Sequence, residues 1–224
     1  MVMKLLIKFP TRNRPDKFFD VLDRYYSMID DIDNTEFCIT IDDDDLTMNN
    51  DSVLDRLDTY KNLYWYLGDS KTKIEAVNAD LEDFTDFDIL LLASDDMIPQ
   101  VQGFDNDIRE NMEKYFPDTD GILWFYDGKR KDLNTLCILG KKYYDRFGYI
   151  YHPGYKSFYC DDEFTQVGNR LGKQQFIEKV IIEHKHPDNT PGVSNDELYM
   201  ANSKYYPIDN KFFLLRQKNR FGLK

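Results

Sequence analysis

The sequence has few cysteines, no long apolar run and fewer basic than acidic residues. Its three cysteines, Cys38, Cys137 and Cys160, are scattered in apolar surroundings, which argues against a disulfide framework and indicates buried thiols in a reducing compartment. No stretch approaches the roughly 20 apolar residues of a membrane-spanning helix. Residues 2–9 lack the length and the cleavage site of a signal peptide. These absences predict a soluble, cytoplasmic protein.

Acidic residues outnumber basic ones, 41 to 29, and the formal net charge is −12. Such a surface repels phosphate backbones, so nucleic-acid binding through overall charge is disfavoured, although a local basic groove is compatible with it. The acids are clustered, most densely in residues 42–45, and such clusters suit divalent cations. A calcium loop of the EF-hand type is not expected, because Met48 stands where the sharp turn needs glycine and no glutamate closes the loop.

Apolar runs alternate with helical periodicities along the first half of the sequence. Runs with the length of buried strands occupy residues 3–9, 36–41, 63–67 and 89–93. Helical patterns lie between them, from Pro15, from Asp51, which can cap a helix, and over residues 71–81. This order, with strands that look buried on both faces, predicts an α/β fold with a mostly parallel central sheet flanked by helices.

The second half of the sequence is expected to complete a single domain, followed by a C-terminal extension. Helices are expected over residues 104–116 and 161–171, and strands over residues 121–126, 136–139 and 176–184. Residues 143–159 are rich in aromatic side chains and glycine, which is typical of a binding surface. The tail, residues 212–224, mixes apolar and basic side chains.

The chemistry is expected to centre on residues 89–99. The apolar run of this stretch ends at two adjacent acids, Asp95 and Asp96. In an open α/β sheet, ligands bind at the carboxyl ends of the strands. Paired carboxylates at such a place offer hard oxygen ligands for Mg²⁺ or Mn²⁺ beside a phosphorylated substrate. The alternative is that both acids only cap the turn or helix that follows.

Polar residues also follow the first two expected strands. Thr11, Arg12 and Arg14 come after the first, and arginine suits contact with a pyrophosphate or stacking on a base. A plain solvated loop would have a similar composition. Asp42 closes the second strand and is able to accept a hydrogen bond from a nucleobase imide. Their shared position at strand ends is the main indication that these residues form one site.

Acidic and basic residues near the C-terminus complete the candidates. Asp161 and Asp162 begin an expected helix, whose dipole favours a carboxylate at that position. Either is able to act as a general base, and either could simply cap the helix. His184 and His186 stand at the end of the last expected strand, and a neutral imidazole is a good ligand for Mn²⁺.

Together, these pieces resemble a glycosyltransferase of the GT-A fold, similar to the large inverting family two. They follow the family's order over residues 3–190, most of the chain. Residues 8–15 (Lys-Phe-Pro-Thr-Arg-Asn-Arg-Pro) resemble the first-strand loop that holds the nucleotide. The resemblance implies nucleotide contacts from Pro10, Thr11, Arg12 and Arg14.

Two further pieces resemble the family's nucleotide-binding residues. Asp42 matches the acid that contacts the base. Lys73, with Ala76 and Asn78, resembles the motif of a small or basic residue, then Ala, then Asn, beside the nucleotide. The resemblance therefore implies that Lys73 and Asn78 lie close to the donor.

The expected metal site resembles the family's DxD motif. In Ser94-Asp95-Asp96, serine replaces the first acid of that motif. The resemblance implies that Asp96 holds the Mn²⁺ or Mg²⁺ that bridges the diphosphate, and that Ser94 and Asp95 face the donor. His184 matches the histidine that joins the metal in many relatives, and His186 is the second candidate.

The expected base resembles the family's Glu-Asp-x-Asp-Leu motif. It corresponds to Asp161-Asp162-Glu163-Phe164, with Cys160 in place of the glutamate. The resemblance implies that Asp161 is the general base, with Asp162 as the alternative.

The resemblance implies a metal-dependent transfer of a sugar from a nucleotide-sugar, with a UDP-sugar favoured, to an acceptor hydroxyl with inversion. Residues 1–190 would form the transferase domain, with a nucleotide-sugar half over 1–100 and an acceptor half over 101–190. Residues 191–224 would form an extension or lid, in which the basic residues Arg216, Lys218 and Arg220 close over the diphosphate.

The acceptor and two other functions stay open at this point. The acceptor could be a glycan, a small molecule or a hydroxymethylated base of viral DNA. A non-catalytic module that binds nucleotide-sugar or glycan on a degenerate GT-A fold is one alternative. A nucleotidyltransferase is disfavoured, because residues 10–15 contain no glycine and therefore no glycine-rich phosphate loop.

Overall fold

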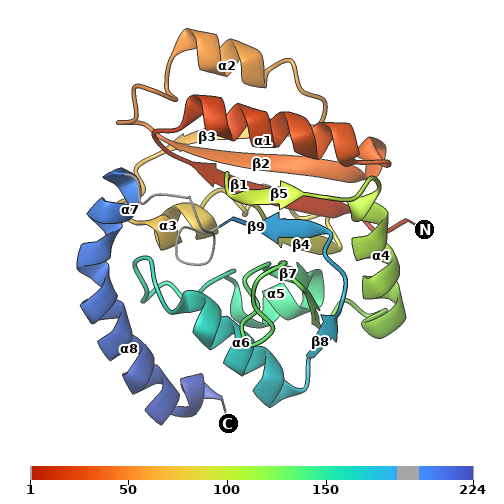
Figure 1. Ribbon diagram of the computed structural model, residues 1–224, viewed down its shortest axis with the longest axis vertical. Helices are drawn as coiled ribbons and strands as arrows, with labels where there is room; N and C mark the ends of the chain where they lie inside the picture. The colour runs from red at the N-terminus through yellow and green to blue at the C-terminus, as the bar shows by residue number, and fades with distance from the viewer. Residues whose placement is uncertain (1, 186–196, 224) are drawn as a thin grey trace.

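The computed structural model describes residues 2–185 and 197–223, which form a central sheet covered by helices (Figure 1). The sheet has seven strands in the order β3-β2-β1-β4-β7-β6-β8. Its strands are β1 (Leu5–Thr11), β2 (Thr35–Asp42), β3 (Leu63–Gly68), β4 (Ile89–Leu92), β6 (Ile122–Phe125), β7 (Ile138–Gly140) and β8 (Gln174–Ile177). A second, antiparallel sheet pairs β5 (Met97–Pro99) with β9 (Ile182–His184).

Eight α-helices connect and cover these strands within the described residues. They are α1 (Pro15–Met28), α2 (Asp51–Leu57), α3 (Lys73–Asn78), α4 (Phe104–Tyr115), α5 (Lys141–Phe147), α6 (Cys160–Leu171), α7 (Glu197–Asn202) and α8 (Tyr206–Lys218). Short 3-10 helices occupy Ile32–Asn34, Ser203–Tyr205 and Arg220–Gly222. None of the described helices combines the length and apolar character needed to cross a membrane.

Strand β1 lies between β2 and β4, and all three run parallel. Lys8 stands opposite Cys38 on β2 and Leu92 on β4, so the carboxyl ends of the three strands meet at one edge of the sheet. Strand β3 continues the parallel order outside β2, whereas β7 is antiparallel to both β4 and β6. The loops that follow β1, β2 and β4 therefore leave the sheet side by side.

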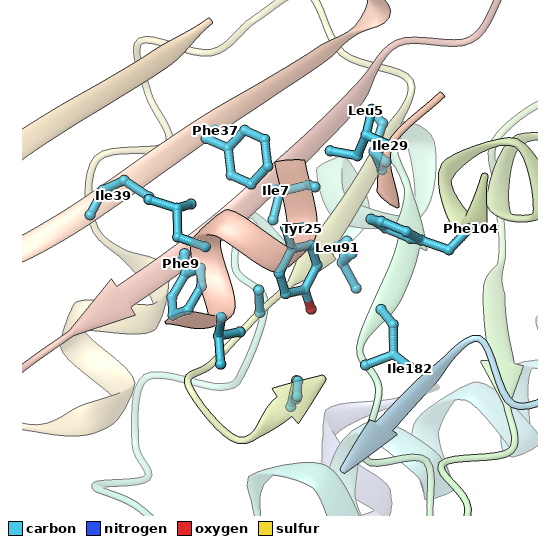
Figure 2. Packing of buried hydrophobic residues seen from close by; sticks show 14 of the residues in the cluster. Leu5, Ile7, Phe9, Tyr25, Ile29, Phe37, Ile39, Leu91, Phe104 and Ile182 are labelled. Atoms are coloured by element: carbon cyan, nitrogen blue, oxygen red, sulfur yellow. The ribbon is translucent and has the colours of Figure 1, made fainter. Parts of the chain in front are cut away.

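Aromatic packing fixes α1 and α4 against β1. The ring of Tyr25 on α1 lies 6.2 Å from that of Phe9 and 5.4 Å from that of Phe104, measured between centroids (Figure 2). Phe37 on β2 completes the group at 6.4 Å from Tyr25. All four side chains are fully buried, and each such burial contributes about 1.5–3 kcal/mol. The loop between β1 and α1 is thus anchored at both ends.

The expected α/β fold with a mostly parallel central sheet is confirmed, and so is the alternation of strands and helices in the first half. The three cysteines are free and buried, as expected. The helix expected to be capped by Asp51 is α2, but its cap is Asn50, whose side chain accepts a hydrogen bond from the backbone N–H of Val53 at 3.2 Å.

The single strand expected over residues 176–184 is wrong. The structure has two strands there: β8 extends the main sheet beside β6, and β9 leaves it to pair with β5. The chain turns between them, where Lys179 forms an ion pair with Asp107 of α4. Strand β5 itself was not expected. The tail forms helix α8 for most of its length.

A buried ion pair joins α4 to the N-terminal half of the sheet. Arg109 Nη1 lies 2.5 Å from Asp105 Oδ2, and its other nitrogens donate to the carbonyl oxygens of Met3 and Asn34 and to Thr35 Oγ1. Both charged side chains are almost completely buried. Removing Arg109 would leave the buried charge of Asp105 without its counter-charge, with the backbone N–H groups of Asp30 and Asp31 as its hydrogen-bond donors.

We therefore expect Arg109→Met to lower the free energy of unfolding by about 3–5 kcal/mol. Urea denaturation measures the change, with Glu113→Gln, an exposed site on the same helix, as the control. A loss below about 1 kcal/mol would mean that the pair contributes no more than a surface ion pair.

Candidate functional site

The candidate site lies where the loops after β1, β2 and β4 leave the sheet. Arg12 Nη1 donates to Asp42 Oδ2 at 2.7 Å and to Asp44 Oδ1 at 2.6 Å, which ties the first loop to the second. Burial raises the pKa of Asp42, and its pairing with Arg12 opposes that rise. Within the described part of the chain, Asp42 Oδ1 and Thr11 Oγ1 are buried without a hydrogen-bond partner. Both oxygens are therefore buried polar atoms at this edge whose hydrogen-bonding capacity is unused.

The first loop is also tied to the strand end of β4. Arg14 Nη1 lies 3.0 and 3.1 Å from the two carboxylate oxygens of Asp95, and Lys17 Nζ lies 3.3 Å from Oδ1. Asp95 is therefore held between two cations. Pro10 and Thr11, which were expected in the loop after the first strand, are the last two residues of β1 and stand opposite Thr40 and Ile41.

Asp96 has quite different partners from Asp95. Ser94 donates its hydroxyl hydrogen bond to Asp96 Oδ1, and His184 Nε2 lies 3.5 Å from Asp96 Oδ2. Although burial opposes ionisation, the contacts with His184 and Ser94 and the charge of Lys73 hold the pKa of Asp96 well below its usual range. Asp96 is therefore a carboxylate over the whole physiological pH range.

The small β5–β9 sheet brings His184 to this place. Met97 on β5 pairs with His184 on β9, and the N–H of Lys185 donates to the carbonyl oxygen of Asp96 at 2.8 Å. His184 is therefore fixed beside Asp96 by backbone pairing rather than by its side chain alone. The other candidate ligand, His186, lies outside the described residues.

Asp96 and His184 fit a divalent cation as two of its ligands. Adjacent ligands of an octahedral Mg²⁺ ion lie roughly 3 Å apart, because each is about 2.1 Å from the ion. The distance of 3.5 Å between Asp96 Oδ2 and His184 Nε2 is close to that spacing. A carboxylate with an imidazole suits Mn²⁺. Across residues 2–185 and 197–223, no group of three or more His, Cys, Asp or Glu side chains is placed to hold a metal ion.

Helix α3 places Lys73 and Asn78 differently from each other. Lys73 is the first residue of α3, and its positive charge helps to lower the pKa of Asp96. Asn78, at the other end, accepts hydrogen bonds from the N–H groups of Ile150 and Tyr151 at 2.9 and 3.2 Å. Its amide nitrogen donates to the carbonyl oxygen of Tyr151 at 2.7 Å. The side chain of Asn78 therefore binds the backbone of another loop.

Asp161 and Asp162 lie in the first turn of α6. Burial, together with the charge of Asp161, raises the pKa of Asp162 to about 6, and Arg130 opposes this rise. Asp162 is thus poised to exchange a proton near neutral pH, which is favourable for a general base. Burial raises the pKa of the neighbouring Cys160 thiol, Asp161 adds to the rise and Lys73 opposes it. Lys73 therefore acts electrostatically on both Asp96 and the start of α6.

Several residues that contribute to this arrangement were not expected from the sequence. Lys17 lies one helical turn after Arg14, and this spacing could have indicated that both reach the same acid. Asp45 accepts a hydrogen bond from the backbone N–H of Asn13 at 2.7 Å. Asn13 has a positive φ of 60°, so Asp45 stabilises a strained loop conformation.

The aromatic stretch over residues 143–159 contains core residues as well as surface ones. Tyr151 and Tyr155 are buried, with 5% and 0% of their surface exposed, so they do not offer faces to an acceptor. The cavity that Tyr151 helps to line has a volume of about 30 Å³, which is room for water rather than for a sugar.

The sequence matches no protein-family model and no curated protein. Solved structures do match. The mannosyltransferase PcManGT from Pyrobaculum calidifontis, in complex with GDP-Man and Mn²⁺, has a TM-score of 0.65 and 17% identity over 84% of this chain and 58% of that one.

Residues 1–349 of TarS from S. aureus, in complex with UDP, have a TM-score of 0.64 and 14% identity over 81% of this chain and 60% of that one. The complex of the same protein with UDP-GlcNAc has a TM-score of 0.62 and 14% identity over 81% of this chain and 58% of that one. The chain therefore spans about three fifths of the length of these structures. The likeness shows that the chain has the GT-A fold.

Proposed function

We propose that the protein is a glycosyltransferase that transfers a sugar from a nucleotide-sugar donor to an acceptor hydroxyl. The observation that carries this proposal is the Asp96–His184 pair at the carboxyl end of β4, on a GT-A fold. The neighbours with bound GDP-Man, UDP and UDP-GlcNAc support a nucleotide-sugar as the donor class, and UDP is our favoured nucleotide. Residues 1–190 would form the transferase domain and residues 191–224 its extension.

The strand-end edge would bind the nucleotide. The unpartnered oxygens of Thr11 and Asp42 suit hydrogen bonds to the base, and Arg12 would orient Asp42 for this contact. Arg14 and Lys17, which neutralise Asp95, would lower the electrostatic cost of bringing a diphosphate close to this acidic edge.

Asp96 and His184 would hold a divalent cation, Mn²⁺ or Mg²⁺. When bound, such an ion supplies positive charge against the negative charge that builds on the leaving diphosphate. Lys73, whose charge already acts on Asp96, would add a fixed positive charge on the same side of the site.

The acceptor hydroxyl would lose its proton to the carboxylates at the start of α6. Asp161 is our proposed general base, and Asp162 is the alternative. Attack of the acceptor oxygen on the anomeric carbon forms the new glycosidic bond as the bond to the diphosphate breaks. Because this is a single displacement, the configuration at that carbon inverts.

The direct test is hydrolysis of the donor, with water as the acceptor. Purified protein is incubated with Mn²⁺ and a panel of UDP-, GDP- and TDP-sugars, and the release of nucleoside diphosphate is followed. We expect release from one donor, and its loss on addition of EDTA. No release from any donor, with no nucleotide binding by calorimetry, would contradict a transferase and favour a degenerate binding module.

We expect Asp96→Asn to reduce donor turnover by about 10²–10³-fold, because it removes the carboxylate charge at the proposed metal position. His184→Gln should reduce it as well. Asp33→Asn is a matched control, since this aspartate side chain is 75% exposed and forms only a surface ion pair with Lys61. Turnover of Asp96→Asn at the control rate would exclude the proposed metal position.

We expect Asp161→Asn to reduce turnover by at least about 10²-fold, as removal of a general base does.

In the wild type, turnover should fall as the pH is lowered through 6, because Asp162 takes up a proton there and the Asp161–Asp162 pair loses one negative charge. Asp162→Asn should keep measurable turnover and lose this pH step. If Asp162→Asn alone abolishes turnover, the base is Asp162.

A further inference from the structure

Helix α8 holds the loop that leads into α6 through one buried carboxylate. Asp209, which is fully buried, accepts hydrogen bonds from the backbone N–H groups of Lys156 at 2.9 Å, Ser157 at 2.8 Å and Phe158 at 2.9 Å. Hydrogen bonds to an ionised acceptor are roughly twice as strong as neutral ones. The next residue, Tyr159, is the N-cap of α6 and has a positive φ of 62°. Asp209 thus fixes the backbone directly before the helix.

A second polar contact joins α8 to the first turn of α6. Arg216 Nη2 lies 2.5 Å from Glu163 Oε1, and its Nε lies 3.1 Å from Oε2. Tyr155 donates its hydroxyl hydrogen bond to the same carboxylate at 2.8 Å. Glu163 directly follows Asp161 and Asp162, so this two-point contact ties the turn that carries both acids to α8.

Aromatic packing reinforces these contacts. Phe213 of α8 stacks on Tyr159 with 5.5 Å between ring centroids, and Phe212 packs against Tyr155 at 4.9 Å. A Cβ atom at Gly154 would lie 2.2 Å from the ring of Phe212. The loop therefore approaches α8 so closely that any larger residue at this position would require the ring of Phe212 to move.

The same loop is held on its other side by α3. The N–H of Ile74 donates to the carbonyl oxygen of Lys156 at 3.4 Å, and the side chain of Asn78 binds the backbone of Tyr151. The start of α6 is thus placed by two helices, one of which begins with Lys73. Figure 1 shows α8 running along the outer side of α6.

We propose that Asp209 and Arg216 are positioning residues for the reaction. By binding residues 156–158 and Glu163, they fix the first turn of α6 in the orientation that presents Asp161 and its neighbour to the acceptor. This inference rests on the proposed function. Arg216, one of the basic residues expected to close over the diphosphate, is paired with Glu163, so α8 contacts the turn that carries the proposed base.

Four variants test the inference in the full chain: Asp209→Asn, Arg216→Met, Arg216→Lys and the control Lys211→Met, an exposed site on α8. A misplacement of about 1 Å costs roughly 10²-fold in rate. We therefore expect Asp209→Asn and Arg216→Met to lower kcat for donor hydrolysis by about that factor, with smaller losses in Arg216→Lys, which keeps the charge. The KM for the donor and the Kd for the nucleotide should change less than about twofold, because the nucleotide edge lies on other elements.

Hydrogen exchange and thermal melting complete the design. The amides of residues 156–158 should exchange faster in Asp209→Asn than in the wild type or in Lys211→Met, and melting verifies that each variant is folded at the assay temperature. If Asp209→Asn does not fold, Arg216→Lys and Arg216→Met carry the test.

The outcomes separate this inference from the proposed function. Wild-type kcat in folded Asp209→Asn and Arg216→Met would overturn the positioning role and leave the transferase intact. A parallel loss of nucleotide affinity would also overturn it, because the disturbance would then extend beyond α6. A wild-type protein without turnover contradicts the proposed function, and the positioning role is rejected with it.

Discussion

Keeping clustered carboxylates ionised at one edge of the sheet is the constraint on which the site depends, because burial and repulsion from Asp44 and Asp45 oppose the ionisation of Asp42 at the end of β2. The loop after β1 relieves this repulsion with cations: Arg12 binds Asp42 and Asp44, and Arg14 binds Asp95. Because β1 lies between β2 and β4, one loop reaches the acids on both sides. The parallel order of three strands is therefore what makes this acidic edge stable.

Asp96 differs from the acids that bind these cations because, within the described residues, it is not paired with an arginine or lysine side chain. It receives a serine hydroxyl and an imidazole where its neighbour Asp95 receives two cations. The pairing of β5 with β9 places the imidazole of His184 beside Asp96. The two strands are far apart in sequence: the paired residues Pro99 and Ile182 are separated by 83 positions. Asp96 thus keeps its negative charge, and the charge of Lys73 acts both on Asp96 and on Cys160 at the start of α6.

Local patterns in the sequence were sufficient to predict the parallel half of the fold. Strand β4 is apolar over its whole length, β1 and β2 are mostly apolar and mostly buried, and polar groups that the sequence displays stand at or just after the end of each strand. Strand β5 was missed because three residues that include Pro99 carry no periodicity. Residues 176–184 were merged into one strand because nothing local marks the point at which β9 leaves the main sheet.

The candidate site was predictable as a set of residue types at strand ends, but not as a set of contacts. Which cation binds which acid depends on the register of β1 with its neighbours, so the Arg14–Asp95 pair could not be derived from spacing. Asn78 was expected beside a nucleotide, and nothing in the sequence indicated that its side chain binds the backbone at Tyr151. The contact of Glu163 with Arg216 joins residues 53 positions apart and becomes visible only when α8 is packed on α6.

We propose that the edge formed by the carboxyl ends of β1, β2 and β4 binds a nucleoside diphosphate. Calorimetric titration of UDP and GDP into the protein, with and without Mn²⁺, tests this claim most directly. The account predicts binding at one site that is tighter with Mn²⁺ and is weakened by Asp42→Asn. Absence of binding by both nucleotides, or binding that Asp42→Asn leaves unchanged, would contradict it.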